Sequence, residues 1–196
     1  ILLGIIAALN RNRWPDRLVM VLALLGTTIP TFVFAAVLQY VFTVTVPLFP
    51  TTGWGTWGHL VLPVACMCVG PLASYARYMR SSVLDITNQD FILTAEAKGV
   101  SSFRIVSRHI FRNSFLPCIT MICTSIAGIF SGSFIIESIF AIPGLGKYFI
   151  SAINDRDYSV VLGLNIIFTG TYILSILVCD ILLAIIDPRI RIAEEN

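Results

Sequence analysis

The chain has 196 residues, of which 57% are hydrophobic and only 12% are charged, and its mean hydropathy is +0.87. Soluble domains carry about 25% charged and about 45–50% apolar residues, so this chain has too little polar surface to face water on all sides. An ordinary soluble enzyme, a disordered segment and a nucleic-acid-binding module are therefore excluded. The formal net charge of +2 is also too small to indicate nucleic acid as a partner. The composition predicts an integral membrane protein.

Four apolar stretches are long enough to cross a membrane as helices, because about 20 apolar residues span a hydrocarbon core of about 30 Å. They cover residues 18–46, 60–76 (running on to 79), 115–136 and 160–186. A fifth stretch, residues 1–9, is about half as long as a span requires, and we interpret it as the end of a truncated helix that continues upstream. The sequence predicts an all-α, polytopic membrane protein with four complete transmembrane helices and the end of a fifth, forming a single transmembrane domain over residues 1–196.

The basic residues indicate how these stretches are oriented. Eleven of the 13 Lys and Arg residues fall in alternate connections, namely residues 10–17, residues 77–113 and the tail after residue 186. The positive-inside rule places these connections in the cytoplasm. Trp14, Trp54 and Trp57 lie at the ends of predicted spans, where amphipathic rings settle at the lipid headgroups. The two signals predict the same multi-pass arrangement.

Motifs that would carry catalysis or metal binding are incomplete in this sequence. Residues 144–147 look like the end of a phosphate-binding loop, but Ala141 and Tyr148 stand where that motif needs Gly and Ser or Thr. The histidines, His59 and His109, have no partners at metal-ligand spacing, and the five cysteines lie in or beside apolar stretches, where we interpret them as small packing residues. We expect no catalytic residue, no metal site and no nucleotide cofactor in this subunit.

The most informative segment is the basic loop, which we define as residues 81–113. Asp90 is placed to cap a short helix over residues 91–98, which Gly99 would end. Ala95 and Ala97 are expected to leave one side of this helix thin. Such a helix is suited to close approach by another surface.

A second helix is expected to begin at Ser101 or Ser102, and Pro117 is expected to mark the entry to the next span. Three arginines at intervals of four residues predict one basic stripe along it: Arg104, Arg108 and Arg112. The stripe could bind anionic lipid headgroups, at about 1 kcal/mol per basic residue. Alternatively, the loop is a docking element for a groove on a soluble partner. The residues alone leave both interpretations open.

Short motifs in a fixed order begin in the basic loop with Thr94-Ala95-Glu96-Ala97-Lys98-Gly99. They continue with Arg108-His109 and Arg112-Asn113, and Leu116-Pro117 follows just after the loop. This order resembles the cytoplasmic EAA loop of ABC-importer permeases of the binding-protein-dependent transport family, most closely its peptide/nickel branch. One position departs from the family pattern. The eponymous Glu of the family lies six residues before the Gly, where this chain has Leu93, and Glu96 occupies a different position.

Motifs outside the loop extend the resemblance over essentially the whole chain. They are Trp14-Pro15-Asp16-Arg17, Ile136-Glu137-Ser138-Ile139-Phe140, Pro143-Gly144-Leu145-Gly146, Arg156-Asp157-Tyr158 and Asp187-Pro188-Arg189-Ile190-Arg191. The third and fourth of these are similar to the B-type oligopeptide or dipeptide permease subunit rather than to its C-type partner.

The resemblance implies a non-enzymatic permease subunit of the prokaryotic inner (plasma) membrane. Such a subunit pairs with a homologous second permease to form the pathway for oligopeptides or dipeptides, which an extracytoplasmic binding protein delivers. Two cytoplasmic ATPase subunits, which hold the ATP and Mg²⁺, dock on short coupling helices in loops of this kind. The residues to which the resemblance assigns this coupling are Ala95, Ala97, Lys98, Gly99, Arg104, Arg108, His109, Arg112 and Asn113.

Two acidic residues lie in or at the end of predicted spans, where exposing an ionised carboxylate to lipid is energetically costly. Asp180, within the last predicted span, either hydrogen-bonds to a neighbouring helix or faces the pathway. Glu137, near the outer end of its span, either helps to shape an outer gate with the turn at residues 143–146 or reaches the headgroups. Two other functions are also considered. The first is transport of nickel or another metal chelate by the same family, and the second is an ion-coupled secondary transporter, which should show internal repeats and midplane acids in interrupted helices.

Overall fold

The computed structural model describes residues 1–130 and 133–186, and within these residues the regular structure is entirely helical. The chain divides into two compact units. Among the described residues, the first contains residues 1–26, 72–123 and 180–186; the second contains residues 27–71, 124–130 and 133–179.

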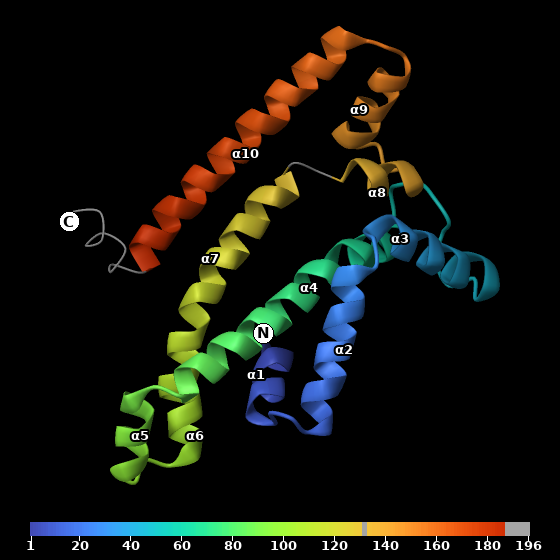
Figure 1. Cartoon of the computed structure of the whole chain (residues 1–196). Coiled ribbons are helices and arrows are strands. Elements are labelled where there is room, and N and C mark those ends of the chain that lie inside the picture. Colours follow the sequence, from blue (N-terminus) through green and yellow to red (C-terminus); the bar gives the residue numbers. More distant parts are fainter. Residues whose placement is uncertain (131–132, 187–196) are drawn as a thin grey trace. The chain divides into compact units, whose positions relative to one another are not determined.

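The first unit carries the basic loop. Its elements are α1 (Leu2–Leu9), most of α2 (Trp14–Thr28), the later part of α4 (Trp57–Thr87), α5 (Asp90–Ala97), α6 (Ser102–Arg104), the π-helical turn η2 (Ile105–Ile110) and most of α7 (Phe111–Phe130). The segments α6, η2 and α7 follow one another without interruption, so the second helix of the basic loop runs directly into the next apolar stretch. Figure 1 shows α5 beside α6 at the end of this unit, and α5 also contacts η2.

The core of the first unit lies between the basic loop and the later part of α4. Met79 and Val83 of α4 are fully buried and pack with Ile92 of α5. The remaining buried members of this core are Ala8, Ala95, Ile105, Ile110 and Cys118. Because these residues come from five elements, α5 is part of the packed core rather than a detached loop.

Small side chains allow α1 to approach α4 closely. A Cβ added to Gly4 would overlap the carbonyl oxygen of Ala76 and would lie 2.8 Å from the Cβ of Met79. Beside this contact, Ala7 of α1, Val19 of α2 and Ala76 form a second small buried cluster. Such packing of small residues is typical of helix contacts in membranes, where backbones approach one another without a hydrophobic driving force.

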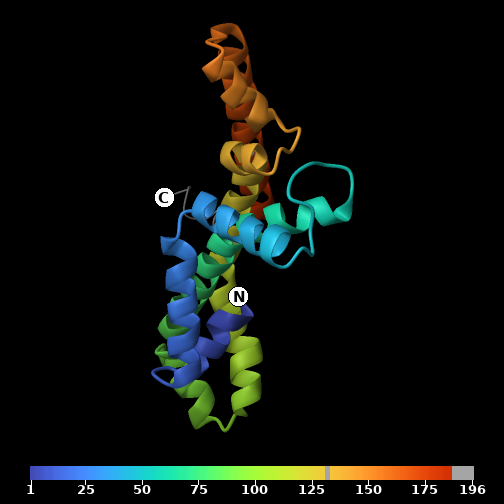
Figure 2. The same ribbon diagram turned by 90° about the vertical axis from the view of Figure 1, so that its right-hand side faces the viewer.

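The second unit contains two short helices packed around the first part of α4. Its elements are α3 (Thr31–Gln39), the π-helical turn η1 (Tyr40–Thr45), the first part of α4, α8 (Phe134–Ile139), α9 (Leu145–Asn154) and most of α10 (Tyr158–Ile186). The short helix α8 contacts both α3 and α9 (Figure 2). Ile136 and Phe140 of α8 are buried against Ala35 of α3 and against Leu62 and Cys66 of α4.

Three aromatic rings connect α8, α9 and α10. The centroid of the Phe134 ring lies 5.0 Å from that of Phe149 and 5.3 Å from that of Phe168, and the rings of Phe149 and Phe168 are 5.9 Å apart. Separations in this range are favourable for aromatic pairs. The cluster therefore holds α9 against the first half of α10.

Two of the predicted spans are confirmed as long apolar helices. Among the described residues, α4 and α10 are long and apolar enough to cross a membrane, and a third span results if α2 and the α3–η1 segment are counted together. Both helices extend beyond the predicted ranges of 60–76 and 160–186. The count of four complete transmembrane helices is not confirmed, because α7 contributes only a shorter apolar segment over Pro117–Ile126.

The predicted span over residues 18–46 consists of separate helical segments in the structure. The structure ends α2 at Thr28 and begins α3 at Thr31, with Pro30 in an extended conformation (φ −57°, ψ 137°) as the N-cap residue. Proline disfavours helical geometry at the preceding residue and has no backbone N–H to donate, so the helix ends before it. The chain then continues as α3 and η1 up to Thr45.

The predicted stretch 115–136 also differs from the structure. Pro117 was expected at the entry to the span, but it lies inside α7, which begins at Phe111 and ends at Phe130. Ser133 then adopts an extended conformation and caps the separate helix α8, accepting a hydrogen bond from the backbone N–H of Ile136 at 3.4 Å. The closing motif at residues 187–191, with the two arginines of the predicted basic tail, lies outside the described residues.

Candidate functional site

The helix at the centre of the basic loop begins one residue earlier than predicted. Asp90 is the first residue of α5 and not its cap, because Gln89 precedes it in an extended conformation (φ −83°, ψ 145°) as the N-cap residue. Asp90 still favours the helix in this place, because a carboxylate in the first turn is attracted by the positive end of the helix dipole. The side chain of Thr94 donates back to the carbonyl of Asp90 at 2.9 Å.

Gly99 ends this helix as the sequence predicts. It has φ +73°, the left-handed conformation that glycine adopts without steric cost. The N–H of Gly99 donates to the carbonyl of Glu96 at 2.9 Å, and the N–H of Val100 donates to that of Ala95 at 3.2 Å. This pair of bonds is the Schellman motif, and the packing of Val100 against the buried core adds its usual apolar contact. The exit of the chain from α5 is therefore firmly defined.

The two alanines of this helix do not form one thin side. Ala95 is buried in the core of the first unit, whereas Ala97 is exposed. Residues two apart on an α-helix are about 200° apart around its axis, which places them on opposite sides. A direct contact between a partner and Ala95 therefore does not fit the geometry, and Ala97, Lys98 and Gly99 are the exposed residues of the predicted coupling set in α5 and its cap.

The outward side of the basic loop combines apolar and basic side chains. Leu93 is 59% exposed and Phe103 is 84% exposed, and Phe91 is exposed beside them. The arginines of the predicted basic stripe, at positions 104, 108 and 112, are all exposed. Large exposed apolar side chains next to cations mark a surface that other molecules cover.

His109 and Asn113 have a structural contact within the second helix of the loop. His109 is half-buried, and its backbone carbonyl accepts a hydrogen bond from the side-chain amide of Asn113 at 2.7 Å. The bond spans the transition from η2 into α7, where the backbone pattern changes from π to α. The bond satisfies the backbone carbonyl of His109 at this transition. A role of His109 or Asn113 in coupling stays a prediction.

A buried ion pair next to the basic loop was missed by the sequence analysis. Arg80 of α4 binds Asp16 of α2 with two hydrogen bonds, from Nε to Oδ1 at 2.5 Å and from Nη2 to Oδ2 at 2.7 Å. The Asp16 side chain is 4% exposed and that of Arg80 is 24% exposed. The backbone N–H of Asn12 donates to Asp16 Oδ2 at 2.9 Å, and Asn12 has φ +62°, which asparagine tolerates. An acidic residue among three arginines (11, 13 and 17) was the available sequence signal.

Glu137 connects α8 to the beginning of α9. Its Oε2 accepts a hydrogen bond from the backbone N–H of Lys147 at 3.1 Å, and its Oε1 lies 3.4 Å from the backbone nitrogen of Ser133. A carboxylate is favoured at a helix N-terminus, where backbone N–H groups have no partner in the helix itself. Glu137 thus contacts the predicted turn at residues 143–146, and its part in an outer gate stays a prediction.

The two glycines of this turn leave room for that contact. A Cβ added to Gly144 would overlap the Glu137 carboxylate, with 2.5 Å to its Cδ. A Cβ added to Gly146 would lie 2.8 Å from Glu137 Oε2 and 2.9 Å from the Cα of Phe134. The Pro-Gly-Leu-Gly motif therefore has a steric reason, which is the close approach of α8 to the beginning of α9.

We expect Gly144→Ala to destabilise the second unit by about 2 kcal/mol, because the new methyl group displaces a carboxylate whose hydrogen bonds are each worth about 1.5–3 kcal/mol. In a Glu137→Ala background the same substitution should cost little, since the three nearest obstacles all belong to Glu137. Thermal unfolding of the four proteins of this double-mutant cycle measures the difference. Equal costs in both backgrounds would contradict the contact.

Asp180 is exposed on α10. Among the described residues it has neither a hydrogen-bond nor an ion-pair partner, so the predicted bond to a neighbouring helix is not observed in this part of the chain. A charge within an apolar helix must face protein or water. Its role in the pathway stays a prediction.

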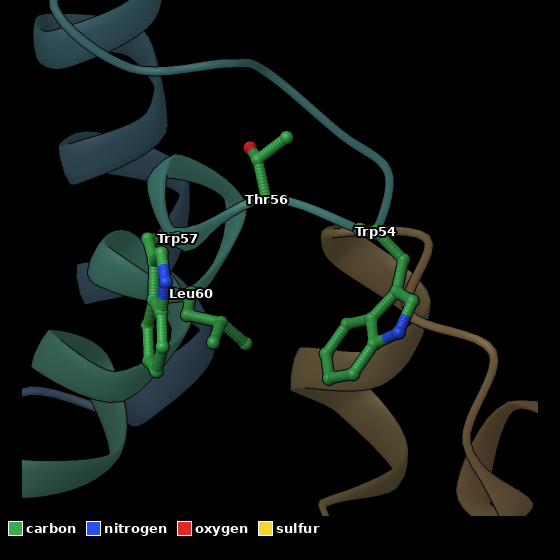
Figure 3. A pocket seen from close by; sticks show the side chains of 5 residues that line it. Trp54, Thr56, Trp57 and Leu60 are labelled. Atoms are coloured by element: carbon green, nitrogen blue, oxygen red, sulfur yellow. The ribbon is translucent and has the colours of Figure 1, made fainter.

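An aromatic hollow lies at the beginning of α4. It has a volume of about 210 Å³ and is lined by Trp54, Gly55, Thr56, Trp57 and Leu60. Figure 3 shows the two indole rings on either side of the hollow, with Leu60 between them. Both tryptophans are exposed, as expected for rings that lie at the level of lipid headgroups.

Comparison with known proteins identifies the family. The model of the "Binding-protein-dependent transport system inner membrane component" family matches residues 1–192. The chain belongs to this family. As a member of the family, it is an inner membrane component, which agrees with the apolar helices α4 and α10.

Relatives of this inner membrane component are named as permeases for peptides. The chain is 45% identical over its whole length to the dipeptide transport system permease protein DppB of Bacillus subtilis, covering 64% of that protein. It is 44% identical to the oligopeptide transport system permease protein OppB of Haemophilus influenzae, over 96% of this chain and 62% of the relative. It is 39% identical to the glutathione transport system permease protein GsiC of Escherichia coli K12, over 96% of this chain and 61% of the relative. The chain thus spans slightly less than two thirds of the length of these curated relatives.

Proposed function

We propose that this chain is a permease subunit of an ATP-driven importer, in which it forms half of the pathway for dipeptides or oligopeptides. It pairs with a homologous second permease, receives substrate from an extracytoplasmic binding protein and takes its energy from two cytoplasmic ATPases that hold ATP and Mg²⁺. The membership of the family and the names of the relatives support this proposal.

The observation that carries the proposal is the construction of the basic loop. Its helix α5 is fixed on the inside by Ile92 and at its end by the Schellman motif at Gly99, while Leu93 and Lys98 face outward. A surface that receives a mechanical displacement must be rigid, or the displacement is lost within the loop. The outward side combines the apolar and basic groups that a protein partner can bind, which favours docking over binding to lipid headgroups alone.

The names of the relatives indicate the class of substrate. DppB, OppB and GsiC are named for a dipeptide, an oligopeptide and glutathione, which is itself a small peptide. A peptide is therefore favoured over nickel or another metal chelate. Membership of a binding-protein-dependent family likewise favours an ATP-driven importer over an ion-coupled secondary transporter.

The finer membrane arrangement belongs to the same proposal. Four spans and the end of a fifth cross the membrane, with α7 and the broken α2–α3 stretch as two of them, and together they form one permease domain. The basic loop lies in the cytoplasm because it holds four of the 13 basic residues and two more, Arg77 and Arg80, come just before it. Asp180 faces the second permease or the water of the pathway, where an ionised carboxylate is tolerated.

Substitution of Gly99 tests the coupling role of the loop. Gly99→Leu forces a branched side chain into a left-handed conformation, which costs about 1–2 kcal/mol. It also places a larger side chain on the outward side of the basic loop, which is the proposed docking surface. Space at the residue is not limiting, since none of the described atoms lies within 4 Å of an added Cβ. We expect normal membrane insertion but a loss of transport-coupled ATP hydrolysis of about tenfold, within the range of measured coupling energies. Proteoliposomes with the assembled importer provide the measurement.

Gly99→Asn is the matched control, because asparagine tolerates the left-handed conformation better than other residues with a Cβ. It should retain more coupled hydrolysis than Gly99→Leu. Co-purification of the intact subunit with two ATPase subunits tests the proposal more broadly. A Gly99→Leu importer with wild-type coupling, or an active subunit that purifies alone, would overturn the assignment.

A further inference from the structure

We infer that the Asp16–Arg80 ion pair is a positioning element for coupling, which makes α2 follow α4 when the ATPase partner moves the basic loop. The inference rests on the proposed function, because it requires a partner that displaces the loop. Neither residue belongs to the docking surface, so their effect on transport would act through the position of α2.

The geometry of the pair fixes two helices in both distance and orientation. Two parallel hydrogen bonds join the Arg80 guanidinium to the Asp16 carboxylate, at 2.5 Å and 2.7 Å. A third donor, the backbone N–H of Asn12, holds the carboxylate from the side of the α1–α2 connection at 2.9 Å. A bidentate pair is directional, unlike an apolar contact, so α2 cannot slide or rotate against α4 without breaking at least one bond.

The burial of Asp16 indicates that the ion pair does more than hold α2 and α4 together. Asp16 is 3% exposed, and Ala7, Val19 and Ala76 form an apolar contact of α1, α2 and α4 in the same unit. A buried ion pair gives little net stability compared with well-packed apolar residues. Apolar packing alone would therefore be sufficient to join these helices. What the ion pair adds is a fixed position of α2 along and around α4.

The basic loop is connected to the same stretch of α4. Ile92 and Ala95 of α5 pack in one core with Met79 and Val83, and Arg80 lies between these two residues in the sequence. A displacement of α5 is therefore applied to α4 within one helical turn of Arg80. The ion pair then passes that displacement sideways to α2.

The receiving helix is suited to carry the displacement further. From Trp14 to Thr28, α2 is one uninterrupted helix, and Asp16 lies in its first turn. With the ion pair intact, α2 and α4 move as one body at this end. With the pair removed, α4 follows α5 alone, and ATP is hydrolysed with less movement of the helices that form the pathway.

The test uses the intact subunit in proteoliposomes with its second permease, ATPases and binding protein, and a labelled dipeptide as the probe. The variants are Asp16→Asn, Arg80→Gln, the two combined, and Arg80→Lys. We expect retained ATPase subunits, basal ATP hydrolysis within about twofold of wild type, and about tenfold less dipeptide transported per ATP. The combined variant should be no worse than either single one, and Arg80→Lys should lie between, because lysine keeps the charge but loses the paired bonds.

Arg17→Gln is the matched control, since it removes the same charge from an exposed neighbour of Asp16 and should leave the transport ratio unchanged. A wild-type ratio in Asp16→Asn, or additive losses in the combined variant, would overturn the inference. Failure of all the pair variants to assemble, Arg80→Lys included, would show a purely structural role and overturn it as well. A wild-type subunit that retains no ATPase would instead refute the proposed function, so the two failures are distinguishable.

Discussion

Ile92→Ala should loosen α5 from the first unit and lower the stability of that unit by about 2–5 kcal/mol, the usual cost of removing a large aliphatic side chain from a packed core. Ile92 is only 1% exposed and packs with residues of α4 and η2. The loss should appear as a lower thermal unfolding midpoint and as faster amide hydrogen exchange in α5. ATPase coupling should fall with it, because the docking helix no longer transmits force to α4.

Leu93→Ala is the matched control, because it removes a similar side chain from the next residue, about 100° further around the helix, where Leu93 is 59% exposed. Its effect on stability should be within about 0.5 kcal/mol. Retention of the ATPase subunits should nevertheless weaken, since Leu93 lies on the proposed docking surface. Equal destabilisation by the two variants would show that α5 is not packed in this orientation.

Gly4→Ala should destabilise the contact between α1 and α4 by about 3 kcal/mol, at the upper end of the usual cost of overpacking. The added methyl group would overlap the Ala76 carbonyl oxygen and would approach the backbone nitrogen of Arg80 to 3.1 Å. These two atoms are joined by a hydrogen bond of α4, so they cannot move aside as a flexible side chain can. Thermal unfolding of the purified subunit measures the loss.

Gly163→Ala provides the control for this substitution. Gly163 lies in α10, and none of the described atoms is within 4 Å of an added Cβ. Alanine is favoured over glycine within a helix by about 0.5–1 kcal/mol, so this variant should be neutral or slightly more stable. A Gly4→Ala protein that unfolds at the wild-type temperature would contradict the close packing of α1 on α4.

The prolines show where prediction from the sequence reaches its limit. Pro30 separates two helices, whereas Pro63, Pro71 and Pro117 lie inside uninterrupted ones. Each removes a backbone donor in the same way, so a local rule treats them alike. Whether the helix continues depends on whether neighbouring helices and side chains satisfy the backbone groups that proline leaves unpaired. That information is not contained in the flanking residues.

Some features of the candidate site could likewise be predicted from the sequence, and others could not. The end of α5 at Gly99 was predictable, because a Schellman motif depends on residues within one turn of each other. The sides taken by Ala95 and Ala97 were wrongly predicted, because a helix this short can present either side to α4. The Asp16–Arg80 pair joins residues 64 positions apart, and the excess of arginines in this part of the chain offers several alternative partners for the carboxylate.

Composition and short motifs were sufficient to place this chain in a membrane, to identify its family and to locate the loop that we propose couples it to ATP. These are properties of hydropathy and of neighbours a few residues apart. Three further features depended on packing: the inward position of Ile92 and Ala95, the bidentate Asp16–Arg80 pair, and the Glu137 carboxylate in the space left by Gly144. Each joins segments that are separate in the chain, and burial selects among partners that the sequence alone presents as equivalent.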